Sequence, residues 1–258
     1  VRGLSLDGLT CFNAEGLGLE SPDGKITAAQ VAETYEAHIH NDSFEHMVQP
    51  KMVYISNPTE VGTIYSKAEL TALSETCHKY GLYLFLDGAR LGYGLAAPDN
   101  DLTLPEIAAL CDVFYIGGTK VGALFGEAVV IKNPELAQDF RYLIKQNGGM
   151  LAKGRLLGLQ FDALFTDGLY QEISAHAIAM AEKLREAFTA KGYNYLAPNR
   201  TNQIFVIVPD AHLAKISEQF EYSYDQRIDA THSCVRFCTG WATKEENVDA
   251  LIRCVEKL

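Results

Sequence analysis

The chain has 258 residues, of which 48% are hydrophobic and 21% charged, and its formal net charge is −11. This composition is too apolar for a disordered chain and too charged for a bundle of transmembrane helices. The negative charge argues against binding to nucleic acid or to an anionic membrane surface, because both would repel it. One small phosphorylated ligand is compatible with this charge, since it needs only a local basic patch.

Six cysteines are scattered along the chain, and no two of them form a Cys-x-x-Cys pair. In a chain of this length, the pattern predicts buried free thiols rather than a disulfide framework. Free thiols are typical of a reducing compartment, so we expect a cytoplasmic protein. The residues concerned are Cys11, Cys77, Cys111, Cys234, Cys238 and Cys254.

The first part of the chain alternates between strand and helix patterns. The run Met52–Ser56 predicts a strand. A capping box at Ser66-Lys67-Ala68-Glu69 opens an amphipathic helix that ends at Gly81. Three further apolar runs predict strands: Leu82–Leu86, Val113–Ile116 and Ala128–Ile131. Apolar runs separated by helices indicate a buried, mostly parallel sheet with flanking helices.

The pattern changes from about residue 165, which predicts a large domain over residues 1–167 and a small α+β domain over residues 168–258. A long helix is expected over Leu169–Lys191 and a short one over residues 211–220. Strands are expected over Gln203–Val208 and Val235–Thr239. A second capping box, beginning at Thr243, predicts the start of the last helix.

Polar groups follow two of the predicted parallel strands. One strand ends in Asp87-Gly88-Ala89-Arg90 and another in Gly117-Gly118-Thr119-Lys120. Ligands bind at this edge of an open parallel sheet. Taken singly, Asp87 could cap a helix, Arg90 could pair with an acid, and Lys120 could be a solvated loop residue.

The combination favours pyridoxal phosphate (PLP). A desolvated lysine in a glycine-rich turn is suited to form a Schiff base, since burial lowers its pKa and glycines allow a ligand to approach closely. A carboxylate at the neighbouring strand end can hold a pyridinium nitrogen protonated, which PLP needs in order to act as an electron sink.

The two strand ends, with the sequence that follows the second as far as Ala128, resemble the low-specificity L-threonine aldolases of the aromatic amino acid β-eliminating lyase/threonine aldolase group. Further similarity lies at Ser21–Thr27, Thr59–Thr63 and Arg236-Phe237, so that residues 21–258 are covered. The resemblance implies an α/β fold of the fold-type I PLP-dependent transferase class, with a mostly parallel central sheet flanked by helices and a small C-terminal α+β domain.

The resemblance also implies roles for individual residues near the cofactor. Lys120 would form the Schiff base with PLP, and its neighbour Thr119 would lie against the cofactor. Asp87 would bond the pyridine nitrogen, and Arg90 would contact the ring's phenolic oxygen. Arg236 would bind the substrate α-carboxylate through its bidentate fork, with a structural ion pair as its alternative.

A basic cluster beside Gly148-Gly149 would approach the cofactor phosphate, in some relatives from a neighbouring subunit. Its members are Lys145, Lys153 and Arg155, for which a solvated helix face is the alternative.

His46 would lie near the substrate hydroxyl and accept its proton. Two alternatives are that a water molecule accepts this proton and that His46 is a structural residue. His38 and His40 form a His-x-His pair, but no third ligand with useful spacing accompanies them, so we expect no metal site.

The resemblance implies PLP-dependent cleavage of L-threonine or L-allo-threonine to glycine and acetaldehyde, by a homodimer or homotetramer. Relatives carry a further N-terminal segment with phosphate-binding, ring-stacking and carboxylate-binding residues, and residues 1–20 match it poorly, so we expect the chain to lack that segment. Two alternatives stay open: β-elimination on another β-substituted amino acid, and a catalytically weak homologue that acts as a subunit or binding protein.

Overall fold

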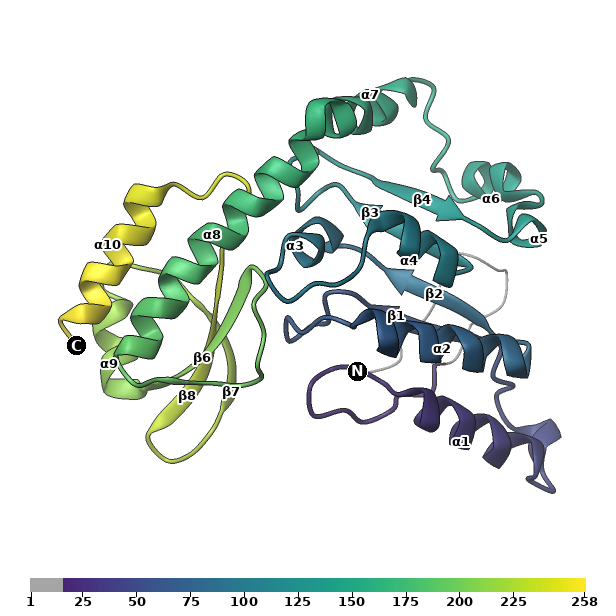
Figure 1. Cartoon of the computed structure of the whole chain (residues 1–258), viewed down its shortest axis with the longest axis horizontal. Helices are drawn as coiled ribbons and strands as arrows, with labels where there is room; N and C mark the ends of the chain where they lie inside the picture. Colours follow the sequence, from purple (N-terminus) through teal and green to yellow (C-terminus); the bar gives the residue numbers. More distant parts are fainter. Residues whose placement is uncertain (1–15) are drawn as a thin grey trace.

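The structure of the protein is a computed structural model in which residues 16–258 are described. Two four-stranded sheets organise these residues, with strand orders β1-β2-β3-β4 and β5-β6-β8-β7 (Figure 1). The predicted residues at strand ends belong to the first sheet and Arg236 to the second. Among the described residues, no helix has the length and apolar character needed to cross a membrane.

The first sheet contains the two strand ends that the sequence singled out. Strands β1 (Met52–Ser56), β2 (Tyr83–Asp87) and β3 (Val113–Gly117) are parallel, whereas β4 (Glu127–Ile131) runs antiparallel to β3. The mostly parallel sheet is therefore confirmed. Every second residue of β1 and β2 is buried and the residues between are half-buried, which differs from the expectation of runs apolar on both faces.

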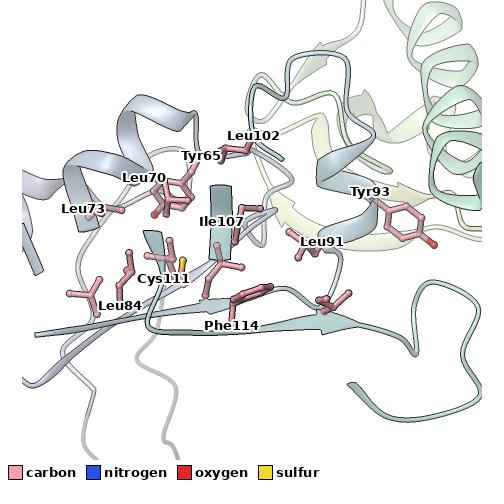
Figure 2. Close-up of a cluster of buried hydrophobic side chains, with 14 of the residues drawn as sticks. Tyr65, Leu70, Leu73, Leu84, Leu91, Tyr93, Leu102, Ile107, Cys111 and Phe114 are labelled. Carbon is pink, nitrogen blue, oxygen red and sulfur yellow. The ribbon is translucent and has the colours of Figure 1, made fainter. Parts of the chain in front are cut away.

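Helix α2 (Lys67–Tyr80) packs its apolar side chains against the buried residues of this sheet. The Ser66 side chain accepts a hydrogen bond from Glu69 N, the Glu69 carboxylate accepts one from Ser66 N, and Gly81 ends the helix at φ +64°. The predicted capping box is thus confirmed. Leu70 and Leu73 of this helix pack with Leu84, Ile107 and Phe114 in one hydrophobic cluster (Figure 2). The remaining helices of this part are α1 (Ala28–Ile39), η1 (Phe44–His46), α3 (Leu91–Leu95) and α4 (Leu104–Leu110).

The second sheet forms a separate layer with its own core (Figure 1). Its strands are antiparallel: β5 (Asn194–Tyr195), β6 (Gln203–Pro209), β7 (Ser223–Arg227) and β8 (His232–Cys238). Helices α9 (Asp210–Ile216) and α10 (Glu245–Glu256) accompany it. Between the sheets the chain forms α5 (Pro134–Ala137), α6 (Phe140–Gln146), α7 (Arg155–Phe165), η2 (Thr166–Gly168) and α8 (Leu169–Ala190).

Helix α8 contributes to both cores. Tyr170, Ala177 and Ile178 belong to the hydrophobic cluster of the first sheet, whereas Met180 and Leu184 belong to that of the second. The predicted division after residue 167 therefore falls just before this helix, and the packing changes from one core to the other within it. The division itself stays a prediction.

Two expectations about local structure were wrong. The last helix begins at Glu245 after Lys244, which makes no side-chain cap. The Thr243 hydroxyl accepts a hydrogen bond from Gly240 N at 2.8 Å instead, so it does not form the predicted capping box. Among the cysteines, Cys77, Cys111 and Cys234 are buried free thiols as predicted, but Cys238 is exposed and Cys254 half-buried. Cys11 lies outside the described residues.

Candidate active site

Glycines bring the ends of β2 and β3 into contact. Gly117 N donates to Gly88 O at 2.9 Å. A Cβ atom on Gly88 would lie 1.9 Å from the Tyr115 carbonyl oxygen, and one on Gly117 would lie 2.2 Å from the Ala89 carbonyl oxygen. Neither position therefore accommodates a side chain, and the Asp87 and Lys120 segments meet at one sheet edge as predicted.

Two residues without a predicted role hold the turn that displays Lys120. The Glu127 carboxylate accepts hydrogen bonds from Gly118 N at 2.7 Å and from the Thr119 hydroxyl at 3.3 Å. The buried Tyr93 hydroxyl donates to the Lys120 carbonyl oxygen at 2.5 Å. Glu127 lies in the stretch that resembles the aldolases, and nothing in the sequence pattern marks Tyr93, because its partner is a backbone atom 27 residues away.

Lys120 and Arg90 face one cavity of about 470 Å³ between the two sheets. No carboxylate forms an ion pair with either residue within residues 16–258. The alternative of a structural salt bridge for Arg90 therefore finds no partner in this part of the chain. Two unpaired cations in one cavity of an acidic protein fit an anionic ligand. The other lining residues are Tyr93, Asn202, Cys238, Thr239, Gly240, Trp241, Ala242 and Thr243.

Asp87 keeps its carboxylate beside this edge of the sheet. Its Oδ1 accepts a hydrogen bond from Ala89 N at 2.9 Å and its Oδ2 accepts one from the Tyr54 hydroxyl at 2.6 Å. The N-cap residue of the next helix is Arg90, which makes no side-chain cap, so Asp87 is not the helix cap of the ordinary alternative. A carboxylate has about four acceptor positions, which leaves capacity for a further donor such as a pyridinium N–H.

Arg236 on β8 does not line the cavity that contains Lys120. It lines a neighbouring cavity of about 380 Å³, and the two cavities share Cys238, Thr239 and Thr243. One guanidinium nitrogen donates to Gln203 Oε1 at 3.2 Å, and the guanidinium carbon lies 5.9 Å from the centre of the Phe205 ring. Among the described residues no carboxylate pairs with Arg236, so its alternative as a structural ion pair is not found either. Its fork remains open to a ligand carboxylate.

The pKa of Cys238 shows how the charges converge. Although Cys238 as a whole residue is exposed, partial desolvation of its thiol raises the pKa, while the positive charges of Arg90, Arg236 and Lys120 act in the opposite direction. Cations from both sheets therefore lie within electrostatic reach of this thiol. The orphaned Oδ1 of Asn202, buried without a partner, lines the same cavity and is available to a ligand donor.

His46 is the predicted site residue that the structure does not bring to Lys120. It is exposed in η1 and precedes β1, whereas Asp87 and Lys120 follow β2 and β3. Parallel strands begin at the opposite edge from the one at which they end. Rings Tyr35 and Tyr80, which lie 4.6 Å apart, and rings His38 and Phe44, at 6.1 Å, join this segment to the end of α2 just before β2. Within the described residues His46 therefore lies apart from Lys120, and its contact with the substrate hydroxyl stays a prediction.

The predicted phosphate-binding cluster also lies apart from the cavity. Lys145, Lys153 and Arg155 are exposed at the end of α6 and the beginning of α7, and none of them lines the cavity that contains Lys120. Thr119 is exposed, with its hydroxyl directed to Glu127. His38 is buried, and no group of metal-ligating side chains occurs in the part of the chain that the structure describes.

The residues present fit PLP at this edge. Lys120 is exposed rather than desolvated as expected, and it offers an amine without an acidic partner. Asp87 offers a carboxylate with free acceptor capacity, and Arg90 a cation on the same cavity.

Known proteins are similar to this chain in sequence and in fold. The sequence matches the beta-eliminating lyase family over residues 10–211. It is 33% identical to the low specificity L-threonine aldolase of Pseudomonas sp. (strain NCIMB 10558), over 91% of this chain and 66% of that protein. It is 31% identical to the low specificity L-threonine aldolase of Pseudomonas aeruginosa, over 81% of this chain and 60% of that protein. The solved Leishmania major threonine aldolase superposes with a TM-score of 0.89 at 43% identity, covering 93% of this chain and 69% of that one.

The chain thus spans slightly less than two thirds of the length of these curated relatives. Its two-sheet arrangement confirms the predicted fold class. The chain belongs to the beta-eliminating lyase family, within the fold-type I enzymes that depend on pyridoxal phosphate.

Proposed function

We propose that the protein is a PLP-dependent lyase that cleaves L-threonine or L-allo-threonine to glycine and acetaldehyde. One observation carries the proposal: the unpaired cations Lys120 and Arg90 face one cavity, and the strand end that carries Asp87 and Arg90 is hydrogen-bonded to the strand end that carries Lys120. The similarity to proteins named threonine aldolases supports the choice of reaction.

In this proposal, bound PLP supplies the sink for the electron pair that Cα retains when the Cα–Cβ bond breaks. The Lys120 side-chain nitrogen holds the cofactor, Asp87 accepts the hydrogen bond of its ring nitrogen, and Arg90 contacts its phenolic oxygen. Arg236 binds the amino acid carboxylate with both arms of its guanidinium. No histidine lines the cavity within the described residues, so a water molecule accepts the proton of the substrate hydroxyl.

The lysine is tested by borohydride reduction of the PLP-saturated chain followed by peptide mass mapping. We expect the label on Lys120 and its loss in Lys120→Ala. Lys191→Ala, which removes an exposed lysine of the second sheet's layer, is the matched control and should retain it. A label elsewhere, or none, contradicts the assignment.

The reaction is tested by giving L-threonine to the purified chain. Acetaldehyde together with an equal amount of glycine is the expected result. Release of 2-oxobutyrate would show elimination instead, and PLP binding without turnover would show a catalytically weak homologue.

We also propose that the chain acts as a cytoplasmic homo-oligomer, a dimer or tetramer. Leu124 is 86% exposed beside Leu156 and Leu159 of α7, which are 50% and 57% exposed. Gln160 on the same helix bonds the backbone of Leu124 and Phe125, so loop and helix present one apolar surface. A second copy on this surface would bury it.

Light scattering after size-exclusion chromatography gives the mass in solution. We expect at least a dimer, and a shift toward monomer in Leu159→Glu. The control Tyr224→Glu changes a residue that is 62% exposed on edge strand β7 and should keep the oligomer. A monomeric unmodified chain would refute the oligomer.

A further inference from the structure

An aromatic row lies on the half-buried face of β1, β2 and β3. Tyr54 pairs in register with Phe85, and their rings are stacked with centroids 5.1 Å apart and planes at 8°. The Phe85 and Tyr115 rings follow at 6.2 Å. Phe85 therefore stands between two tyrosines and sets where their rings lie. Asp87, two residues beyond Phe85, shares this face because side chains alternate along a strand.

Both tyrosine hydroxyls act on the Asp87 carboxylate. Tyr54 donates to Oδ2 at 2.6 Å, and the Tyr115 phenol lies near enough to Asp87 for the carboxylate to raise its pKa. Burial, and then Asp87 itself, raises the pKa of both phenols far above the ordinary value. The phenols therefore stay protonated and remain donors across the pH range in which such a protein is handled.

The backbone completes this arrangement. Ala89 N donates to Oδ1, so that both carboxylate oxygens are held, one from the loop and one from β1. An aspartate that served only to stabilise the turn would be satisfied by the backbone donor and by water. The Tyr54 phenol on the neighbouring strand β1 instead restricts the rotation of the carboxylate about its own bond, with the Tyr115 phenol close by on β3, while acceptor positions stay free.

We propose that Tyr54 and Tyr115 are positioning residues, which hold the Asp87 carboxylate in the orientation that bonds the pyridine nitrogen of PLP. The proposal rests on the proposed function, because it assigns these phenols to the cofactor site. The structure contains a suitable probe: Trp241 is the only tryptophan of the chain, and it lines the cavity with Lys120.

The experiment titrates the full chain with PLP and follows the quenching of Trp241 fluorescence. We expect Tyr54→Phe, which keeps the ring stacked on Phe85, to weaken PLP binding about tenfold, the value of one lost hydrogen bond to a charged group. The combined Tyr54→Phe and Tyr115→Phe variant should weaken it further. Tyr83→Phe removes a phenol from the same face of β2 that makes no hydrogen bond within the described residues, and it should bind as the unmodified chain does.

A second measurement separates positioning from mere support of the fold. The visible absorbance of lysine-bound PLP changes with pH, and its midpoint depends on how firmly the ring nitrogen keeps its proton. A misoriented carboxylate holds that proton less firmly, and the ring then withdraws less charge from the lysine nitrogen. We therefore expect the midpoint to move up by about one pH unit in Tyr54→Phe.

The outcomes are distinct. Unchanged affinity and unchanged midpoint in Tyr54→Phe, with normal binding by the unmodified chain, overturn the positioning role and leave the proposed function intact. Weaker binding in Tyr54→Phe with an unchanged midpoint assigns the phenol to the fold and also overturns it. Failure of the unmodified chain and of Tyr83→Phe to bind PLP overturns the proposed function and this inference with it.

Discussion

Replacing Tyr170 by phenylalanine would remove one hydroxyl that two backbone groups share. Gly92 N donates to this oxygen at 3.0 Å, and the oxygen donates to Gly117 O at 3.1 Å. The tyrosine is 1% exposed, so water cannot replace the lost partner without a rearrangement. Each buried group left without a partner costs about 1–3 kcal/mol, so the loss of both bonds in Tyr170→Phe should lower the free energy of unfolding by about 2–6 kcal/mol.

The matched control is one helical turn away. Ser174 is also fully buried on α8, but its hydroxyl has no hydrogen-bond partner among residues 16–258. Ser174→Ala therefore removes an unsatisfied polar group, and we expect a gain of up to about 1 kcal/mol. Urea unfolding of the two variants and the parent chain gives both values if the slopes agree. A cost below about 0.5 kcal/mol for Tyr170→Phe, the range of ordinary surface changes, would refute the reasoning.

Three further predictions follow from the site and the core. Gly117→Ala places a methyl carbon 2.2 Å from the Ala89 carbonyl oxygen, so it should lower the free energy of unfolding by about 3 kcal/mol or more. Gly158→Ala on α7 meets no atom and should raise that free energy by about 1 kcal/mol. Thermal unfolding of both variants measures the difference. Burial raises the pKa of the Cys77 thiol from 9.0 to about 12. The stability that the buried thiol contributes is present below pH 9 and is lost as pH rises toward 12, because the thiol of the unfolded chain ionises first. The loss of unfolding free energy caused by Cys77→Ala should therefore shrink between pH 9 and pH 12. A loss that stays constant across this range would contradict the prediction. Arg236→Gln should raise KM for threonine about tenfold or more and leave PLP affinity measured through Trp241 unchanged; loss of PLP binding would place Arg236 at the cofactor instead.

The elements that the sequence predicted well are those with local causes. The capping box at Ser66 and the end of α2 at Gly81 depend only on residues within a turn of each other, and both occur as expected. Thr243 carried the same signature, but its hydroxyl is used by Gly240 N, a competing local hydrogen bond that the four-residue pattern does not include. Strand β7 was not predicted because all five of its residues are exposed and polar or aromatic, as an edge strand allows.

In the site, too, the features that follow from a local pattern were predicted, whereas contacts that only the folded chain brings together were not. The Asp87 and Lys120 segments could be placed together because both follow parallel strands, and the carboxyl ends of such strands share one edge. The same rule counts against His46, which precedes its strand. Tyr93, Tyr170 and Glu127 could not be assigned, since each acts through a backbone atom that only the folded chain brings near.

Helix α8 restricts the distance between Lys120, the proposed cofactor-binding residue, and Arg236, the proposed substrate-binding residue. Near its start, the Tyr170 hydroxyl donates a hydrogen bond to the carbonyl oxygen of Gly117, which lies three positions before Lys120. Farther along, the Ala177 carbonyl oxygen accepts a hydrogen bond at 2.7 Å from the hydroxyl of Thr239, which lies three positions after Arg236. Any change in the separation of Lys120 and Arg236 must therefore bend this helix or break one of these bonds. Selection among amino acids by this chain would then operate through side-chain rotamers in the cavity rather than through hinged closure of one sheet upon the other.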